Sequence, residues 1–168
     1  ICEILSLDLD YFTEKAGVVE IHPVAHSESD LPDEFSLVEK RKGAISAGPG
    51  LRPDNDVDFR LAFRNDWLEQ FGGAQQLFVV RVEGDSMVPT LQESDTVLIN
   101  KNANTIGAGG GIFAINWNNM VLVKRLQMNP QTNEIIIKSD NPNYDSMVVK
   151  PHEIQIEGKV IWYGRELR

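Results

Sequence analysis

The sequence predicts a mostly β protein of antiparallel strands with one or two short helices. Two observations support this fold class. Short runs rich in β-branched and aromatic residues recur along the chain, and glycine, asparagine and proline residues separate them. Strands of this length and spacing, with few helical segments, are typical of a mostly antiparallel domain, which we expect over residues 44–168.

The first half of this domain is expected to contain a loop, a strand and a short helix. Residues 43–50 (GAISAGPG) are small and predict a flexible loop. Residues 56–63 alternate between polar and apolar side chains, which indicates a strand. Asn65 is expected to be the N-cap of a helix over residues 66–71, which the following pair of glycines closes.

The second half is richer in strands. Residues 77–82 (LFVVRV) predict a strand that ends at a Gly-Asp-Ser turn. Asn118-Asn119 predicts a tight hairpin, residues 129–133 predict a second turn, and Gly158 is expected to break the last strand in two. The strands expected after residue 82 cover residues 96–99, 112–117, 120–126, 134–138, 154–156 and 159–163.

Two segments precede the expected domain. Residues 1–12 (ICEILSLDLDYF) alternate apolar and acidic side chains and look like the end of a helical unit whose body is absent. Residues 13–43 contain an acidic stretch and a basic stretch without clean periodicity, so we expect a linker or an extended arm there. Because the chain begins with Ile1 rather than Met, we expect a fragment of a longer polypeptide.

The composition argues against several classes of protein. The chain has 25 acidic and 16 basic residues and a net charge of -9, which argues against sequence-independent binding of this chain to the phosphate backbone of a nucleic acid. Its one cysteine, Cys2, excludes an intramolecular disulfide and any cysteine-built zinc site. No apolar run approaches the roughly 18 residues that span a bilayer, and no signal peptide is visible. We therefore expect a soluble, cytoplasmic protein with no membrane partner.

Two familiar ligand motifs are incomplete in the sequence. Residues 107–111 (GAGGG) lack the Gly-Lys-Ser/Thr of a phosphate-binding loop, and we interpret them as an ordinary loop. His22 and His26 are four residues apart, but Pro23 lies between them and no glutamate has the placement of a zinc protease. His152 is distant in the sequence. The sequence therefore predicts neither a metal site nor a cofactor.

Ser86 and Lys124 form the most informative pair. Ser86 follows an apolar strand within residues 84–90 (GDSMVPT), where a glycine permits a tight turn and a proline fixes the backbone. Lys124 lies inside residues 120–126 (MVLVKRL), a strand that is apolar on both faces, where a lysine is rarely buried unless it is paired. Each residue also has an ordinary interpretation: Ser86 could cap a turn, and Lys124 could point to solvent from an edge strand.

One chemical role explains both residues together. A hydroxyl nucleophile needs a base, and a desolvated lysine can act as one. Keeping a lysine neutral at pH 7 requires a pKa about 3.4 units below its usual value, which corresponds to roughly 4.6 kcal/mol. Burial can shift a lysine by up to about 3–5 units. The hypothesis is that Lys124 removes the proton of Ser86, which attacks a carbonyl, while backbone N–H groups near Ser86 stabilise the oxyanion.

Several segments in the same order resemble a known family. The resemblance is to the C-terminal self-cleaving serine peptidase domain of LexA-like and lambda-type phage repressors, and it covers about residues 44–165. The spacing between the serine and the lysine is typical of that family. The segments are GDSMVPTL (84–91), SDTVLI (94–99), VLVKRL (121–126), SDNPNY (139–144) and IEGKVIW (156–162).

The resemblance implies a site and a reaction. It implies that Ser86 is the nucleophile, that Lys124 is the general base, and that the Ala47–Gly48 bond is cut by self-cleavage. A small alanine before this bond and a glycine after it let the backbone enter a tight site. The fold implied is the LexA-like peptidase fold, and the function implied is that of a transcriptional repressor of the phage or SOS type.

The resemblance also implies partners. It implies a homodimer, for which we expect residues 156–163 to form the surface, and an absent N-terminal helix-turn-helix domain that binds operator DNA. RecA filaments formed during DNA damage are implied to stimulate the cut. Cleavage would separate the two domains and remove the avidity of two linked half-sites.

Other functions remain open from the sequence. Pro49 directly follows Gly48 and removes an N–H that a strand-like substrate would use, which favours a regulator that does not cleave and serves for dimerisation or partner sensing. A signal-peptidase-like enzyme also pairs serine with lysine, but no membrane anchor is visible. An accessory subunit of a damage-tolerance polymerase shares the fold.

Overall fold

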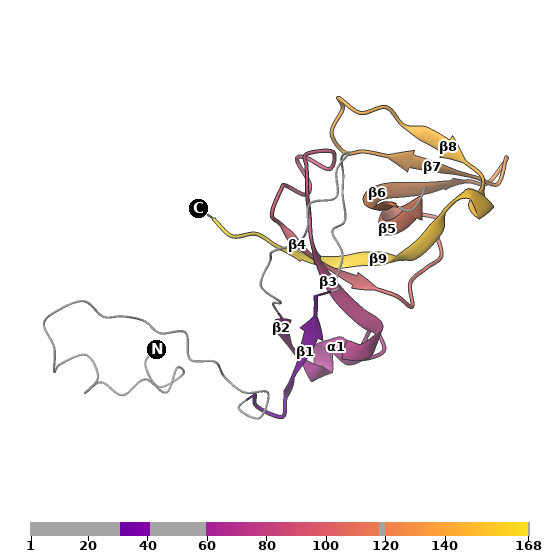
Figure 1. Cartoon of the computed structure of the whole chain (residues 1–168). Helices are drawn as coiled ribbons and strands as arrows, with labels where there is room; N and C mark the ends of the chain where they lie inside the picture. The colour runs from indigo at the N-terminus through magenta and orange to yellow at the C-terminus, as the bar shows by residue number, and fades with distance from the viewer. Residues whose placement is uncertain (1–30, 41–59, 118–119, 168) are drawn as a thin grey trace, which may run out of the picture. The chain divides into compact units, whose positions relative to one another are not determined.

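The computed structural model describes residues 31–40, 60–117 and 120–167 (Figure 1). The segment expected to end a helical unit, residues 1–12, lies outside the described residues, and so does the Ala47–Gly48 bond. The chain divides into two units, and the structure described below is that of the second, Pro32–Arg168.

The described residues form mainly strands, which confirms the expected mostly β fold class. Helical structure among them is limited to α1 (Asn65–Glu69) and two 3-10 turns, η4 (Ala74–Gln76) and η5 (Pro151–Glu153). The strands are β1 (Phe35–Glu39), β2 (Arg60–Arg64), β3 (Leu77–Arg81), β4 (Thr96–Asn100), β5 (Gly111–Trp117), β6 (Met120–Asn129), β7 (Glu134–Lys138), β8 (Met147–Val149) and β9 (Gln155–Gly164).

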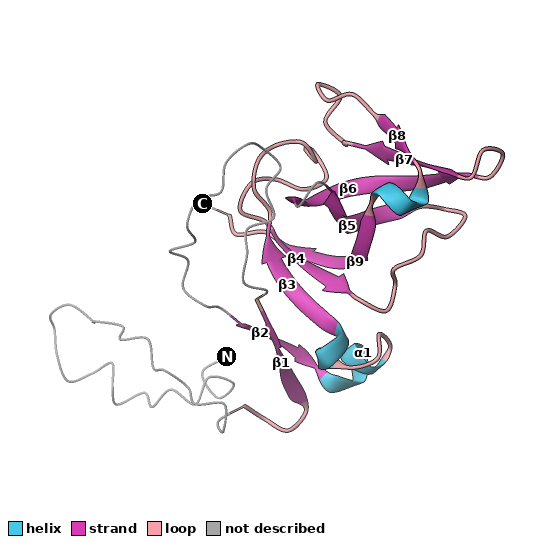
Figure 2. Ribbon diagram, turned by 45° about the vertical axis from the view of Figure 1, so that its right-hand side comes forward, coloured by secondary structure: helices cyan, strands magenta, loops and turns pink. Residues whose placement is uncertain are grey.

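The strands form two sheets, and all the pairings between them are antiparallel (Figures 1 and 2). The larger sheet has the strand order β3-β4-β9-β5-β6-β7-β8, so β9 inserts between strands that are earlier in the chain. Because β6 lies between β5 and β7, it is an inner strand. The edge-strand interpretation of Lys124 is therefore wrong.

The smaller sheet contains a strand that the sequence analysis assigned to a linker. β1 pairs with β2 over its whole length, with Phe35 opposite Arg64 and Glu39 opposite Arg60. The buried side chain of Val38 explains why this segment is ordered, since it packs in an apolar cluster with residues of β3 and β4. The alternation of β1 is weak because Phe35, Ser36 and Leu37 are all partly buried and Glu39 is exposed.

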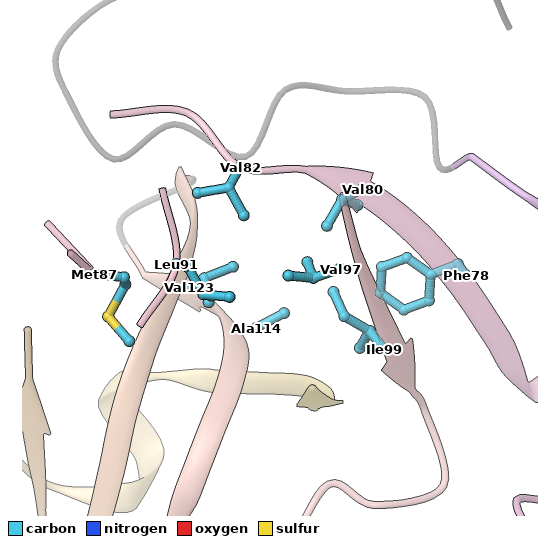
Figure 3. Close-up of a cluster of buried hydrophobic side chains, with 9 residues drawn as sticks. All are labelled: Phe78, Val80, Val82, Met87, Leu91, Val97, Ile99, Ala114 and Val123. Atoms are coloured by element: carbon cyan, nitrogen blue, oxygen red, sulfur yellow. The ribbon is translucent and has the colours of Figure 1, made fainter. Parts of the chain in front are cut away.

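Strand β3, which leads to Ser86, is buried on both faces. Phe78 and Val80 of β3 lie in one core cluster, while Leu77 and Val79 lie in another on the opposite side of the strand. Such a strand reads as a continuous apolar run rather than as an alternation, as the sequence of β3 does. The first cluster is drawn in Figure 3 and consists of Phe78, Val80, Val82, Met87, Leu91, Val97, Ile99, Ala114 and Val123.

The short helix lies one residue earlier than expected and is capped differently. Arg64 occupies the N-cap position and Asn65 is the first helical residue, so the prediction that Asn65 caps the helix is wrong. The Asn65 side chain instead accepts a hydrogen bond from the Ser36 hydroxyl at 2.6 Å. This tertiary contact to β1 was invisible in the local sequence. The helix ends at Glu69, two residues before the expected Phe71, and the glycine pair follows, where the Gly73 N–H donates to the Leu68 carbonyl.

The last two strands also differ from the prediction. β9 is continuous across Gly158, where a register shift and a close approach to β4 replace the expected break: a Cβ there would lie 2.4 Å from the Asn100 carbonyl oxygen. β8 was missed because it is only three residues long. Ile161 and Trp162, within the expected dimer surface of residues 156–163, are partly buried against the cluster that contains Val38, and the dimer surface stays a prediction.

The helices of the described residues are all short. α1 has five residues, and no helix in these ranges has the length and apolar character needed to cross a membrane.

Candidate active site

Ser86 lies in a tight turn that follows β3. The turn is closed by backbone hydrogen bonds from the Val88 N–H to the Asp85 carbonyl and from the Leu91 N–H to the Met87 carbonyl. Gly84 enters it with φ of 78°, a backbone conformation that glycine adopts readily. Ser86 itself is almost completely buried, with 1% of its surface exposed. Its hydroxyl is therefore held on a rigid backbone and away from bulk water.

Lys124 projects from the middle of β6 and is also buried, with 7% of its surface exposed. It pairs with Phe113 of β5, and apolar side chains flank it on both faces of the strand. Val123 packs in the first cluster, whereas Leu122 and Leu126 pack in another. This environment is the one that the sequence predicted, and it deprives the amine of most of its hydration.

The structure brings Ser86 and Lys124 together. The Lys124 Nζ donates a hydrogen bond to the Ser86 Oγ at 2.5 Å. Their chain neighbours help to hold this geometry, because Met87 and Val123 lie in the same apolar cluster (Figure 3). Burial lowers the pKa of the Lys124 amine, and the nearby Asp85 carboxylate opposes this effect in part. A lysine with a lowered pKa is neutral more often near pH 7, and only the neutral amine can accept the proton of the adjacent hydroxyl.

A second turn, at residues 139–144, packs against the serine turn. The Asn141 N–H donates to the Ser86 carbonyl at 3.0 Å, and the Asn141 side-chain amide donates to the Asp85 carbonyl at 3.1 Å. The Tyr144 hydroxyl donates to the Asp85 carboxylate at 2.5 Å, and the Tyr144 ring lies 5.7 Å from the Lys124 Nζ. The pKa of Tyr144 is raised, chiefly by this hydrogen bond.

The residue after Lys124 has a different partner. Arg125 forms two hydrogen bonds with the Asp140 carboxylate, at 2.6 and 2.7 Å. These bonds are the main reason why the pKa of Asp140 lies below its usual value, and a hydrogen bond from Thr90 acts in the same direction. Because Thr90 belongs to the serine turn, Asp140 links that turn to β6.

Sequence reasoning did not identify these supporting residues. Asn141 and Tyr144 were noted only as part of a resembling segment, and Asp85 only as the neighbour of Ser86. The available signal was the Asn-Pro-Asn sequence of residues 141–143, which predicts a turn but does not show what the turn contacts. His152 is exposed on η5, and no cluster of three metal-ligating side chains occurs in the described ranges.

Comparison with models of protein families matches residues 40–161 to the family described as Peptidase S24-like. The matched span includes both Ser86 and Lys124 and extends over most of the chain.

Comparison with curated proteins finds relatives that are named as repressors. A Repressor protein CI of Enterobacteria phage phi80 is 28% identical over 139 residues, which cover 80% of this chain and 58% of the phage protein. A LexA repressor of Pelagibacter ubique is 28% identical over 120 residues, which cover 71% and 50% of the two chains. A LexA repressor of Cupriavidus necator is 26% identical over 163 residues, covering 86% and 71%. The chain spans about half the length of the first two relatives.

Proposed function

Because the chain belongs to the Peptidase S24-like family, we propose that it is the C-terminal part of a transcriptional repressor that inactivates itself by cutting its own Ala47–Gly48 bond. Ser86 is the nucleophile and Lys124 is the general base in this proposal. Relatives named LexA repressor and Repressor protein CI support the repressor assignment.

The contact between Ser86 and Lys124 is the observation that carries the proposal. A buried lysine that has no hydrogen bond to a carboxylate among the described residues is costly to keep charged, and its amine here faces a hydroxyl at 2.5 Å. A nucleophile within hydrogen-bond reach of its base is the signature of covalent catalysis.

The reaction follows from this geometry. The neutral Lys124 amine takes the proton of the Ser86 hydroxyl while the Oγ forms a bond to the Ala47 carbonyl carbon. The carbon–nitrogen bond to Gly48 then breaks, and the new Gly48 amine receives the proton from Lys124. Water hydrolyses the acyl-serine and regenerates both side chains. Positioning of the reacting groups and a general base are each expected to contribute to the rate.

An isolated backbone bridge between Lys40 and Val79 supports cleavage of the Ala47–Gly48 bond by Ser86 of the same chain. Lys40 forms a parallel bridge with Val79, so the two backbones run in the same direction at that point. Ala47 lies seven residues beyond Lys40, and Ser86 lies seven residues beyond Val79. A segment of seven residues spans up to about 23 Å when it is extended. Because Ser86 is also only seven residues from Val79 and part of that segment is a turn, the chain between Lys40 and Ala47 is long enough for Ala47 to reach Ser86, which supports cleavage within one chain.

The partners proposed are those of a regulated repressor. The chain dimerises, an N-terminal domain binds operator DNA, and a RecA filament stimulates cleavage by binding the cleavable state preferentially. Cleavage separates the DNA-binding part from the dimerising part, so that each half-site is bound alone and affinity for the operator falls.

Alkaline incubation tests the proposal. Raising the pH deprotonates Lys124, so the purified chain should yield two fragments whose masses correspond to residues 1–47 and 48–168. Ser86→Ala and Lys124→Ala should each remain intact under the same conditions. Ser139→Ala and Lys138→Ala are matched controls of the same residue types in the same unit, and both should cleave. A cut that persists in Ser86→Ala or Lys124→Ala would refute the Ser–Lys mechanism.

Pro49 favours a second candidate, a regulator of the same fold that does not cleave. Proline restricts the preceding Gly48 and cannot donate a backbone hydrogen bond in an extended substrate. Under this alternative the wild-type chain stays intact at high pH and in the presence of activated RecA. A Pro49→Ala variant that cleaves where the wild type does not would assign the block to this residue.

A further inference from the structure

Two residues around the Ser86–Lys124 pair have contacts that the proposed reaction does not use. Asp85 is next to Ser86 in the chain, and its charge opposes the effect of burial on Lys124. Tyr144 contacts both groups: its hydroxyl donates to Asp85 at 2.5 Å, and its ring lies 5.7 Å from the Lys124 Nζ. A single side chain thus lies against both the base and the carboxylate that affects the base.

We propose that Tyr144 is a positioning residue for the Ser86–Lys124 pair, which holds the Asp85 carboxylate on the 139–144 turn and so prevents it from forming an ion pair with the Lys124 amine. The inference rests on the proposed function, since it concerns the readiness of Lys124 to act as a base.

The hydrogen bonds around Asp85 show how the carboxylate is held. Tyr144 occupies one of its oxygens and the Asn141 amide approaches the other at 3.3 Å. A hydrogen bond from a hydroxyl to a carboxylate is short and strong, because the acceptor is charged. Lys124, in contrast, has its hydrogen bond with Ser86 and none with Asp85 among the described residues.

This arrangement matters because an ion-paired lysine is a poor base. An opposite charge within about 4–6 Å stabilises the ammonium and raises its pKa by about 1–3 units. Asp85 is adjacent to Ser86 and is the described carboxylate that acts on Lys124. Removing the Tyr144 hydroxyl would leave Asp85 with a free oxygen, and the Lys124 ammonium, on which Asp85 already acts, would then attract it.

Placement of Tyr144 supports a role other than packing. Its side chain is 42% exposed, so its removal from water contributes little to the core. Its position is set by the turn, in which the Tyr144 N–H donates to the Asn141 carbonyl and the Asn143 N–H donates to the Asn141 side chain. Asn141 therefore orients Tyr144 and also binds the serine turn directly.

The test is direct titration of the Lys124 amine by NMR in the full chain labelled with ¹³C-lysine, with the Cε signal assigned by its absence in Lys124→Ala. Tyr144→Phe should raise the midpoint of this titration by about 1 pH unit, because the ring remains and only the hydroxyl is lost. Asp85→Asn should lower it by a similar amount. In the double variant, Tyr144→Phe should cause no rise, since the carboxylate on which it acts is gone.

Two matched variants control for general effects. Tyr163→Phe removes the hydroxyl of another exposed tyrosine, and Asp145→Asn removes an exposed charge next to Tyr144 in the chain. Both should leave the Lys124 midpoint within about 0.2 pH unit of the wild type, because Tyr163→Phe removes no charge and the exposed Asp145 charge is screened by solvent. An unchanged midpoint in Tyr144→Phe, or an equal rise in the Asp85→Asn background, would overturn the inference.

The titration separates this inference from the proposed function. It measures the proton on Lys124 whether or not the chain cuts itself, so failure of alkaline cleavage would count against the peptidase proposal alone. Where cleavage does occur, its rate at a pH below the midpoint should fall about tenfold in Tyr144→Phe for each unit of rise. It should recover in the double variant.

Discussion

Lys124 and Arg125 are adjacent on β6, yet they have opposite electrostatic environments. Arg125 meets the Asp140 carboxylate in a two-point contact, which keeps both groups charged. Lys124 meets a neutral hydroxyl, and burial lowers its pKa. Strand geometry separates them, because successive side chains of a strand point to opposite faces. One backbone segment therefore supplies both a fixed structural charge and a base that can lose its proton.

The two electrostatic environments differ because Lys124 and Arg125 have different hydrogen-bond partners, and not only because they are buried to different extents. The Arg125 side chain is 36% exposed and still has a carboxylate, whereas Lys124 is 7% exposed and has no hydrogen bond to a carboxylate within the described ranges. A buried cation without a carboxylate is expensive to keep charged, so it releases its proton more readily. The partner of each basic side chain therefore indicates whether it can act as a base better than the presence of neighbouring basic residues does.

The largest effect is expected from making Lys124 permanently charged. Lys124→Arg retains a long basic side chain, but a guanidinium cannot be deprotonated at accessible pH and cannot serve as a base. The rate of cleavage should fall by at least about 100-fold at every pH, in line with the contribution of a general base. The measurement is the rate of fragment appearance on gels between pH 7 and pH 11.

The reciprocal exchange is the control for that variant. Arg125→Lys keeps a positive charge beside Asp140 and should cleave within about threefold of the wild-type rate, since the base is untouched. An equal loss of cleavage rate in Lys124→Arg and Arg125→Lys would show that Lys124 has no special role as the base, which would contradict the proposed difference between the two residues.

A second ion pair extends the comparison to stability. Asp95 is 1% exposed and receives two hydrogen bonds from Arg165, each at 2.7 Å, and these are the main reason why its pKa is lowered. Asp95→Ala should reduce the free energy of unfolding by about 2 kcal/mol, because it removes the hydrogen bonds of a buried carboxylate, while the Arg165 left behind is 29% exposed and stays hydrated. Urea denaturation at pH 7 measures this loss.

The pH dependence of that loss has a defined sign. A carboxylate with a lowered pKa stabilises the fold above its usual pKa and loses this contribution as the pH falls through the folded-state value. The difference between the wild type and Asp95→Ala should therefore shrink below about pH 4. Glu39→Ala, which removes the exposed pair with Arg60, should cost less than about 1 kcal/mol. A cost for Glu39→Ala equal to that for Asp95→Ala would contradict the role of burial.

The sequence was sufficient for the parts of the fold that local patterns determine. The apolar run of β3, the Asn129–Asn133 turn and the glycine pair after α1 all lie where their residues predicted. Local patterns also indicated that Lys124 lies between apolar neighbours, because that depends only on the side chains of one strand. The catalytic roles of Ser86 and Lys124 remain predictions that cleavage experiments will test.

Features that depend on distant residues were not predictable. β1 is a strand because Val38 finds a buried site beside β3 and β4, and no pattern within residues 35–39 reveals that site. The side chain of Asn65 binds Ser36 instead of capping its own helix. The contact between Asp85 and Tyr144 joins residues far apart in the chain, so it becomes visible only when the two turns pack together.

The smallest effect concerns the cost of keeping Lys124 buried. Lys124→Met replaces the amine with an apolar side chain of similar length, and it should raise the free energy of unfolding by about 1 kcal/mol at pH 7, the low end of the gain seen when an apolar side chain replaces a buried ionic group. The sign follows from linkage: burial lowers the pKa of the folded-state amine, so the unfolded chain binds more protons and wild-type stability rises with pH. The advantage of Lys124→Met should therefore diminish towards about pH 10.5. Lys150→Met, at an exposed position, should show no such trend, and the same trend in both variants would refute a specific cost at Lys124.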